Sequence, residues 1–304
     1  MALSPFTSKQ KLTAKATPTI PIPSQGPAQK FGMLQPQEVV LGLFGEYVSS
    51  GEQVWSGGLV ELLGDLGFSA ASSRIALNRI LVRGLLSAAK VGRFVFYRGT
   101  PRLAIVQDEG RRQTFQPTAE VEWDGQFTLV WYSIPGDQRP QRARLGRWLN
   151  FRGFGALQDG TWIAAGDCER DLLPLISRLE LEQHVVIFVG KLVEATNIPS
   201  LVRRAWHVDD LAKMYRAFVD EFSSCRGNRG RKVNEPRNAF ILRTRLIEMF
   251  RQTTVQDPHL PDSVARVVWK RREAVELFQE LQQSLREPAQ SYFRQRAING
   301  EQLS

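Results

Sequence analysis

The chain has 304 residues, 42% of them hydrophobic and 10% aromatic, which is enough apolar material for the cores of two or three globular domains. Its formal net charge of +9 favours a polyanionic partner such as nucleic acid. Two cysteines, Cys168 and Cys225, lie far apart and argue against a disulfide framework or a structural zinc site. No apolar run approaches the ~18 residues of a membrane-spanning helix, and no signal-peptide pattern is seen. We therefore expect a cytoplasmic protein with no membrane partner.

Residues 1–34 contain five prolines, several serines and threonines, and no acidic residue. Such a composition cannot bury a core, and it predicts a flexible basic tail. Helical periodicity begins at Gln37, where apolar residues recur at three- and four-residue spacing as far as Val48. A second helix is predicted between Ser56 and Leu66, and a glycine follows at the position where a left-handed residue ends many helices.

The stretch between Leu66 and Gln107 carries seven Lys or Arg residues and no Asp or Glu. Ser69 is a typical N-cap for a third helix that runs to Arg83, and Gly84 ends that helix. Two β-rich segments follow, at 85–88 and 93–98. Helix, turn, helix and hairpin in this order predict a winged helix-turn-helix DNA-binding domain over residues 35–116.

The third predicted helix has two distinct faces. A period of 3.6 residues turns Ala76, Leu77 and Ile80 inward and leaves the opposite face free to enter a major groove. Arginine suits guanine and asparagine suits adenine, whereas basic residues in a wing contact phosphate or the minor groove. An ordinary solvated basic helix is the competing interpretation. The predicted DNA-binding residues are Ser72, Arg74, Ile75, Asn78, Arg79 and Arg83 on the helix, and Lys90, Arg93 and Arg98 in the wing.

Residues 117–203 show the order strand, helix, strand, strand, helix, strand, which predicts a ferredoxin-like domain serving dimerisation or effector binding. Its last strand, 184–190, is continuously apolar and predicts a sheet covered on both faces. Residues 204–304 predict a helical C-terminal domain. Its helices are expected at 208–223, 237–251 and 263–287. The whole chain is thus expected to belong to the α+β class.

Residues 35–295 resemble the PaaX family, the repressors of phenylacetic-acid catabolism. The resemblance rests on segments in all three predicted domains: 44–48 and 74–85 in the first, 123–125 and 153–163 in the second, and 204–206, 239–244 and 257–261 in the third. It implies a winged helix, a middle domain similar to the small ferredoxin-like nucleases of CRISPR systems, and a helical C-terminal domain. It also implies a homodimeric repressor of an aromatic-compound catabolic operon that leaves double-stranded operator DNA when an aryl-CoA thioester, such as phenylacetyl-CoA, binds.

An effector of that class carries phosphates, so basic residues of the middle and C-terminal domains are its candidate ligands. The segment 226–232 is more basic than the resemblance leads us to expect, and a solvated loop is its competing interpretation. No tightly bound cofactor is expected. The candidate effector-binding residues are Arg203, Arg204, Arg229, Arg231 and Arg243.

Two other functions use the middle domain. A metal-dependent nuclease needs clustered carboxylates, but Ser133 stands where many relatives have Asp, and Asp137, Asp159 and Asp167 are scattered. We therefore expect no catalytic residue, no metal ion and no enzymatic activity. An RNA-binding protein would need exposed aromatic residues on adjacent strands, for which Trp131, Tyr132 and Phe188 are the candidates. A sheet covered on both faces would bury them.

Overall fold

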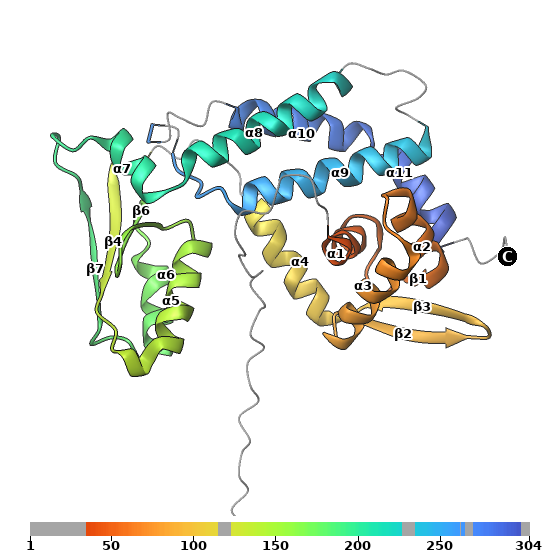
Figure 1. Cartoon of the computed structure of the whole chain (residues 1–304), viewed down its shortest axis with the longest axis horizontal. Coiled ribbons are helices and arrows are strands. Elements are labelled where there is room, and N and C mark those ends of the chain that lie inside the picture. Colours follow the sequence, from red (N-terminus) through yellow and green to blue (C-terminus); the bar gives the residue numbers. More distant parts are fainter. Residues whose placement is uncertain (1–34, 115–122, 227–234, 262, 265–269, 299–304) are drawn as a thin grey trace, which may run out of the picture.

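The computed structural model of the chain describes residues 35–114, 123–226, 235–261, 263–264 and 270–298 (Figure 1). The basic tail at 1–34 and the segment 227–234, with the effector candidates Arg229 and Arg231, lie outside the described residues. Helices predominate and two antiparallel sheets complete the fold, so the predicted α+β class is confirmed. Among the described residues, no helix has the length and apolar character needed to cross a membrane.

The N-terminal unit is a winged helix-turn-helix. Its elements are α1 (Pro36–Tyr47), β1 (Gln53–Trp55), α2 (Ser56–Asp65), α3 (Ala70–Val82), β2 (Leu86–Val91), β3 (Phe94–Gly99) and α4 (Pro101–Thr114). The Ser69 hydroxyl accepts a hydrogen bond of 3.1 Å from the Ser72 backbone N–H, which confirms the predicted cap. Gly84 ends the helix with φ of 67°, a left-handed conformation that glycine adopts without strain.

Strand β1 is not predicted by the sequence pattern. It pairs with β3 and completes a three-stranded sheet in the order β1-β3-β2. Its three residues are too few to show an alternating pattern, so only pairing with Phe96, Tyr97 and Arg98 of β3 makes them a strand.

The middle unit has the predicted ferredoxin-like topology. Its elements are β4 (Gln126–Tyr132), η1 (Gly136–Gln138), α5 (Arg139–Phe151), β5 (Gly155–Gln158), β6 (Thr161–Ala165), α6 (Glu169–Arg178) and β7 (Val185–Lys191). The strand order is β5-β6-β4-β7 and every pairing is antiparallel. Helices α5 and α6 cover one face, where Leu145, Leu149 and Leu172 pack against Val130 and its neighbours.

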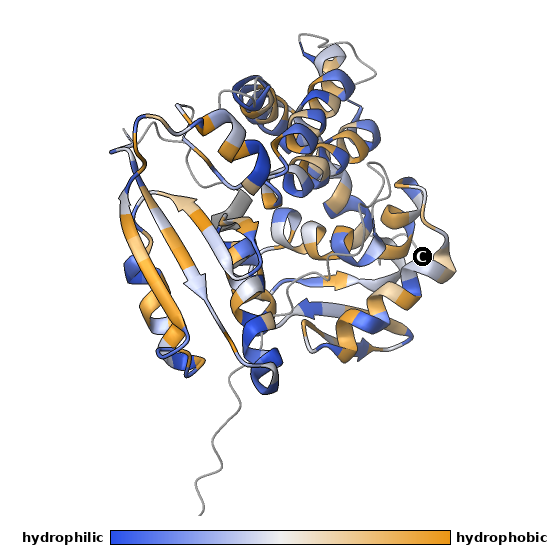
Figure 2. Cartoon of the chain, turned by 60° about the vertical axis from the view of Figure 1, so that its left-hand side comes forward, coloured by the Kyte–Doolittle hydropathy of each residue, from blue (hydrophilic) through white to orange (hydrophobic). Residues whose placement is uncertain are grey.

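The prediction that both faces of this sheet are covered is wrong. On the face away from α5 and α6, the side chains of Trp131 and Phe188 are 49% and 68% exposed, and Val186 is exposed beside them. Only one end of that face, at Phe127 and Ile163, is buried under the segment that follows the sheet. In Figure 2 the sheet of the middle unit comes forward, and much of its ribbon is coloured as hydrophobic. Strand β7 is also an edge strand. In this chain, the continuously apolar strand therefore belongs to a sheet that has one face largely exposed in the single chain.

The C-terminal part is helical, as predicted, with different helix bounds. It contains α7 (Ile198–Ala205), α8 (Val208–Phe222), η2 (Ser223–Cys225), α9 (Pro236–Val255), α10 (Arg271–Ser284), α11 (Arg286–Phe293) and the π-helical turn η3 (Arg294–Ile298). Helix α7 is not among the predicted helices. Of the helix expected over 263–287, the structure describes α10, from Arg271 onward. Residues 265–269 lie outside the described residues, and before them the backbone N–H of Val264 donates to the Pro261 carbonyl.

The winged-helix unit and the C-terminal helices share one hydrophobic core, whereas the middle unit has its own. Tyr47 of α1 stacks on Phe293 of α11 with ring centroids 5.0 Å apart, and it also packs against Phe240 of α9 at 5.6 Å. In Figure 1, α9 and α11 lie against the winged-helix unit. The first and last parts of the chain therefore fold together, and the middle unit is attached to them as a separate lobe.

Candidate nucleic-acid interface

Helix α3 has the two faces that its spacing predicts. Ala76, Leu77 and Ile80 are buried in the core, whereas Ile75 is 55% and Val82 is 80% exposed. Arg74, Asn78 and Arg79 are exposed on the same outward side, and Ser72 and Arg83 are half-buried at the two ends of the helix. This side combines guanidinium and amide donors with an exposed methyl-bearing side chain, the groups that read base edges in a major groove. The helix therefore has the chemistry of a recognition helix.

The hairpin of β2 and β3 forms the wing. Lys90, Arg93 and Arg98 are all exposed on it. Lys90 lies opposite Val95 in the ladder, and the Arg93 guanidinium lies 4.9 Å from the centroid of the Phe94 ring. The wing therefore carries cations on a rigid two-stranded support, an arrangement that suits contact with phosphates.

Every acidic residue between Gln35 and Asp65 forms an ion pair with an arginine of the C-terminal helices. The five pairs are Glu38–Arg251, Glu46–Arg243, Glu52–Arg294, Glu61–Arg296 and Asp65–Arg237, with N to O distances of 3.4, 2.7, 2.8, 3.2 and 2.7 Å. These five acids thus lie toward the C-terminal helices, and the acid-free face of α3 and the wing points outward. Most of these pairs are partly exposed and individually weak, but together they link the winged-helix unit to the C-terminal helices.

The pair between Glu46 and Arg243 is the most buried of the five. The Arg243 side chain is 2% exposed, its Nη2 donates to Glu46 and its Nε donates to the Gln282 carbonyl at 3.3 Å. Burial disfavours the charged form, yet Tyr47 and Glu46 outweigh it and the pKa of Arg243 lies above its usual value. The expectation that Arg243 binds an effector is therefore not supported, because its charge is already used inside the protein.

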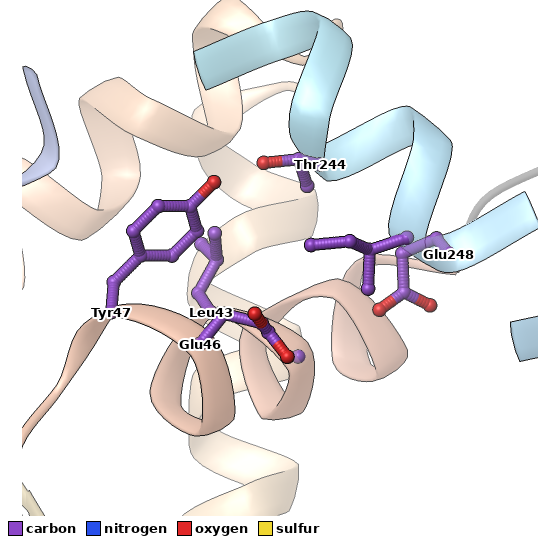
Figure 3. Close-up of a pocket in the computed structure, with 7 residues that line it drawn as sticks. Leu43, Glu46, Tyr47, Thr244 and Glu248 are labelled. Atoms are coloured by element: carbon purple, nitrogen blue, oxygen red, sulfur yellow. The ribbon is translucent and has the colours of Figure 1, made fainter. Parts of the chain in front are cut away.

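A small cavity of about 10 Å³ lies beside this pair, between α1 and α9. Figure 3 shows the hydroxyl groups of Tyr47 and Thr244 pointing toward one another across it. Both oxygens are buried, and neither makes a hydrogen bond of good geometry to another described residue. A cavity of this size holds about one water molecule. It is far too small for an aryl-CoA thioester, so this is a structural polar site and no effector pocket.

The remaining described effector candidates, Arg203 and Arg204, are exposed in the last turn of α7. Helix α7 packs on the sheet of the middle unit and leads directly into α8 of the C-terminal helices. These two cations therefore lie at the junction of the middle and C-terminal parts, a position that the charges in the sequence do not reveal.

The carboxylates of the middle unit serve local roles. Asp159 forms an ion pair with Arg142, Asp167 accepts a hydrogen bond of 2.9 Å from the Glu169 backbone N–H, and Asp137 is exposed. Within the part of the chain that the structure describes, no three His, Cys, Asp or Glu residues gather where they could hold a metal ion. These residues therefore provide no carboxylate cluster that would support the nuclease alternative.

A winged helix with a polarised basic face, joined to a ferredoxin-like lobe and a helical unit, defines a DNA-binding transcriptional regulator. Three family models match the chain in this order: PaaX-like protein over residues 35–103, PaaX protein central Cas2-like domain over 120–202, and PaaX-like protein C-terminal domain over 206–295. The chain belongs to the PaaX family.

Individual relatives agree with this assignment. The chain is 26% identical over 243 residues to the transcriptional repressor PaaX of Escherichia coli (strain K12), an alignment that covers 76% of this chain and 74% of the relative. Its structure is similar to that of an uncharacterised protein from Mycobacterium tuberculosis, with a TM-score of 0.55 and 18% sequence identity over 85% of this chain and 98% of the other. The second similarity shows the shared fold.

Proposed function

We propose that the protein is a homodimeric repressor that binds operator DNA through α3 and the wing and leaves it when an aryl-CoA thioester binds. The observation that carries the DNA-binding part is the outward face of α3. Arg74, Asn78 and Arg79 stand exposed there, and every acid of the preceding segment pairs with the C-terminal helices. Such a face attracts phosphate backbone and offers donors to base edges.

The direct test is selection of duplexes from a random-sequence DNA pool by the purified protein, followed by gel-shift titration of the selected duplex. We expect a sequence preference that is lost in the Asn78→Ala, Arg79→Ala double variant, and an affinity for single-stranded RNA well below that for the selected duplex. Equal enrichment of all sequences, or a preference for RNA, would reject the repressor function.

The homodimer is proposed because a symmetric dimer places two recognition helices in successive major grooves. The open face of the middle sheet supports it. None of the outward-facing residues of β4, β6 and β7 is charged, although the whole chain carries +9. An uncharged apolar face with an unprotected edge strand needs a cover. A second copy of the same face satisfies that need, because two such faces match in polarity.

The effector is proposed to be an aryl-CoA thioester held at the junction of the middle and C-terminal parts by Arg203 and Arg204. Arg229 and Arg231, outside the described residues, are further candidate phosphate ligands from the sequence alone. Exposed arginines bind phosphates through paired hydrogen bonds. Release follows if the ligand favours a dimer whose recognition helices no longer match the half-sites, which needs about 5.5 kcal/mol of differential binding for near-complete switching.

A panel of CoA thioesters and free aromatic acids, compared by thermal unfolding, tests this effector class. Saturation to about 100 times Kd stabilises a protein by about 2.7 kcal/mol. We expect an upward shift in Tm with aryl-CoA thioesters alone, and a smaller shift in the Arg203→Ala, Arg204→Ala variant. A shift with free acids and none with thioesters would reject the CoA class.

RNA binding on the open sheet is the second candidate, and one observation favours it. Trp131 and Phe188 are exposed on the adjacent strands β4 and β7, as in proteins whose sheets stack on RNA bases. Tyr132, the third candidate, is buried against α5 and α6. If this function held, Phe188→Ala would weaken RNA binding and leave the oligomeric state unchanged, the reverse of what the dimer predicts.

A further inference from the structure

We propose that helix α5 of the middle unit forms a second DNA-contacting surface, which grips the phosphate backbone outside the base pairs that α3 reads. The proposed surface, named here the α5 ridge, consists of Arg139, Arg144 and Arg147. It rests on the proposed DNA-binding function and adds a part of the middle unit to the surface that contacts DNA.

Helix α5 contains no acidic residue, and its arginines fall into two groups. Arg142 forms an ion pair with Asp159, and Arg152, at the C-cap, forms one with Asp171 and lies 5.4 Å from the Trp148 ring centroid. These two hold the middle unit together. The three arginines of the α5 ridge are exposed, and no acidic residue in the described parts of the chain pairs with them.

The charges of the α5 ridge work against the helix that carries them. Arg139 occupies the first turn, where the helix dipole favours an acid, and Arg144 and Arg147 are like charges three residues apart. The neighbouring helix α6 has the charges that its dipole favours, with Glu169 and Asp171 in its first turn. The cationic face of α5 therefore lowers local stability slightly, and an external polyanion would reverse that effect.

The packing of α5 directs the ridge away from the sheet. Leu145 and Leu149 are fully buried against the sheet, and at 100° per residue Arg147 lies on the opposite side of the helix, flanked by Arg139 and Arg144. In Figure 1, α5 and α6 lie on the side of the sheet that faces the winged-helix unit. The ridge is therefore on the side of the middle lobe nearest to the lobe that carries α3.

Duplex DNA is the partner that this chemistry fits. Three unopposed arginines match a continuous phosphate backbone, whereas single-stranded RNA is usually bound with stacked aromatic side chains. Trp148, the aromatic residue beside these arginines, packs against the core of the middle unit and has Arg152 over its ring. Such contacts are independent of sequence. They lengthen the bound site and raise its salt dependence without changing which bases are read.

The test compares a ridge variant, Arg139→Ala with Arg144→Ala and Arg147→Ala, with a control variant, Arg178→Ala with Arg216→Ala and Arg286→Ala. The control arginines are also exposed and without an ion pair to any described residue, but they are scattered over α6, α8 and α11. Both variants lose three charges. Affinity is measured over a salt series on a duplex of about 40 base pairs and on one trimmed to about 15, since each lost phosphate contact lowers the salt slope by about 0.9.

On the long duplex, the ridge variant is expected to bind about tenfold or more weakly near 0.1 M salt and to lose about two to three units of slope. On the trimmed duplex, the affinity and salt slope of the ridge variant should equal those of the wild type. The control variant should equal the wild type on both duplexes. Equal slopes for ridge variant and wild type on the long duplex overturn the inference, as does an equal loss in the control or a loss confined to RNA. If the wild type binds neither duplex, the DNA-binding function itself fails, which is a different result.

Discussion

Arg243 of α9 donates a hydrogen bond of 2.7 Å to Glu46 of α1, across 197 residues of sequence. The guanidinium also lies 5.0 Å from the centroid of the Tyr47 ring. Tyr47 is part of the core shared by the winged helix and the C-terminal helices. The DNA-binding unit is therefore held to the last third of the chain by a buried charge pair. Helix α1 also packs on α3, so this pair joins α9 to the helix that supports α3.

Arg243→Ala should lower the free energy of unfolding by about 3 kcal/mol, because it leaves Glu46 without its partner at a largely buried position and removes packing on Tyr47. Urea unfolding measures the loss. Arg245→Ala is the matched control, since that arginine lies on the same helix and pairs with Glu221 at the surface. Its cost should stay below about 1 kcal/mol. Equal effects of the two substitutions would contradict the structural role of Arg243.

Glu248 makes stability depend on pH. Burial raises the pKa of this carboxyl above its ordinary 4.5, Arg251 lowers it in part, and Glu38 and Glu46 raise it further. A raised folded pKa means that the folded state binds more protons, so stability is lost as pH rises from about 4.5 through the folded pKa. Glu248→Gln should therefore gain stability relative to wild type between pH 4.5 and neutrality, measured by urea unfolding. A difference that is constant with pH would contradict this.

Arg79→Ala should weaken binding to the selected duplex by about 1–3 kcal/mol and relax the preference at one base pair. The reason is that an exposed arginine on the outward side of α3 is expected to contact a base edge. Gel-shift titration against single-base variants of the duplex measures both effects. Arg216→Ala, which removes the same charge from α8, should leave affinity and preference unchanged.

Lys90→Ala and Arg93→Ala should each weaken all DNA sequences alike and reduce the slope of log affinity against log salt by about 1. These side chains lie on the wing, where phosphate contact carries no sequence information. The same titrations, repeated at several salt concentrations, check it. Loss of preference at a specific base would instead place the wing in contact with base edges.

Phe188→Asp should give a folded monomer if the open apolar face of the sheet forms the proposed dimer interface, because it places a charge on that face. Light scattering gives the molar mass, and circular dichroism shows whether the fold is kept. Leu173→Asp is the control, since Leu173 is similarly exposed on α6, on the helix-covered side. A dimer that persists in the Phe188 variant would place the interface elsewhere.

Much of the local structure is predictable because local spacing encodes it. The two faces of α3, its Ser69 cap and the Gly84 stop follow from rules that act within a few residues. The strand and helix order of the middle unit is likewise visible in successive apolar patterns. The three-residue strand β1 is not predictable in this way, because only its pairing with β3 makes it a strand.

The acid-free composition from Leu66 to Gln107 is a property of the sequence, and by itself it indicates a polyanionic partner. How that stretch is presented depends on tertiary structure. Five acids between residues 38 and 65 meet five arginines between 237 and 296, and no local spacing relates residues so far apart. The same limit applies to Arg243, which the sequence predicts to be a surface cation although it lies in the core. It also applies to the strand at 185–191, because an apolar run does not show whether a face of the sheet is covered or exposed. Short-range periodicity sets which face of an element is apolar, whereas only packing decides what meets that face.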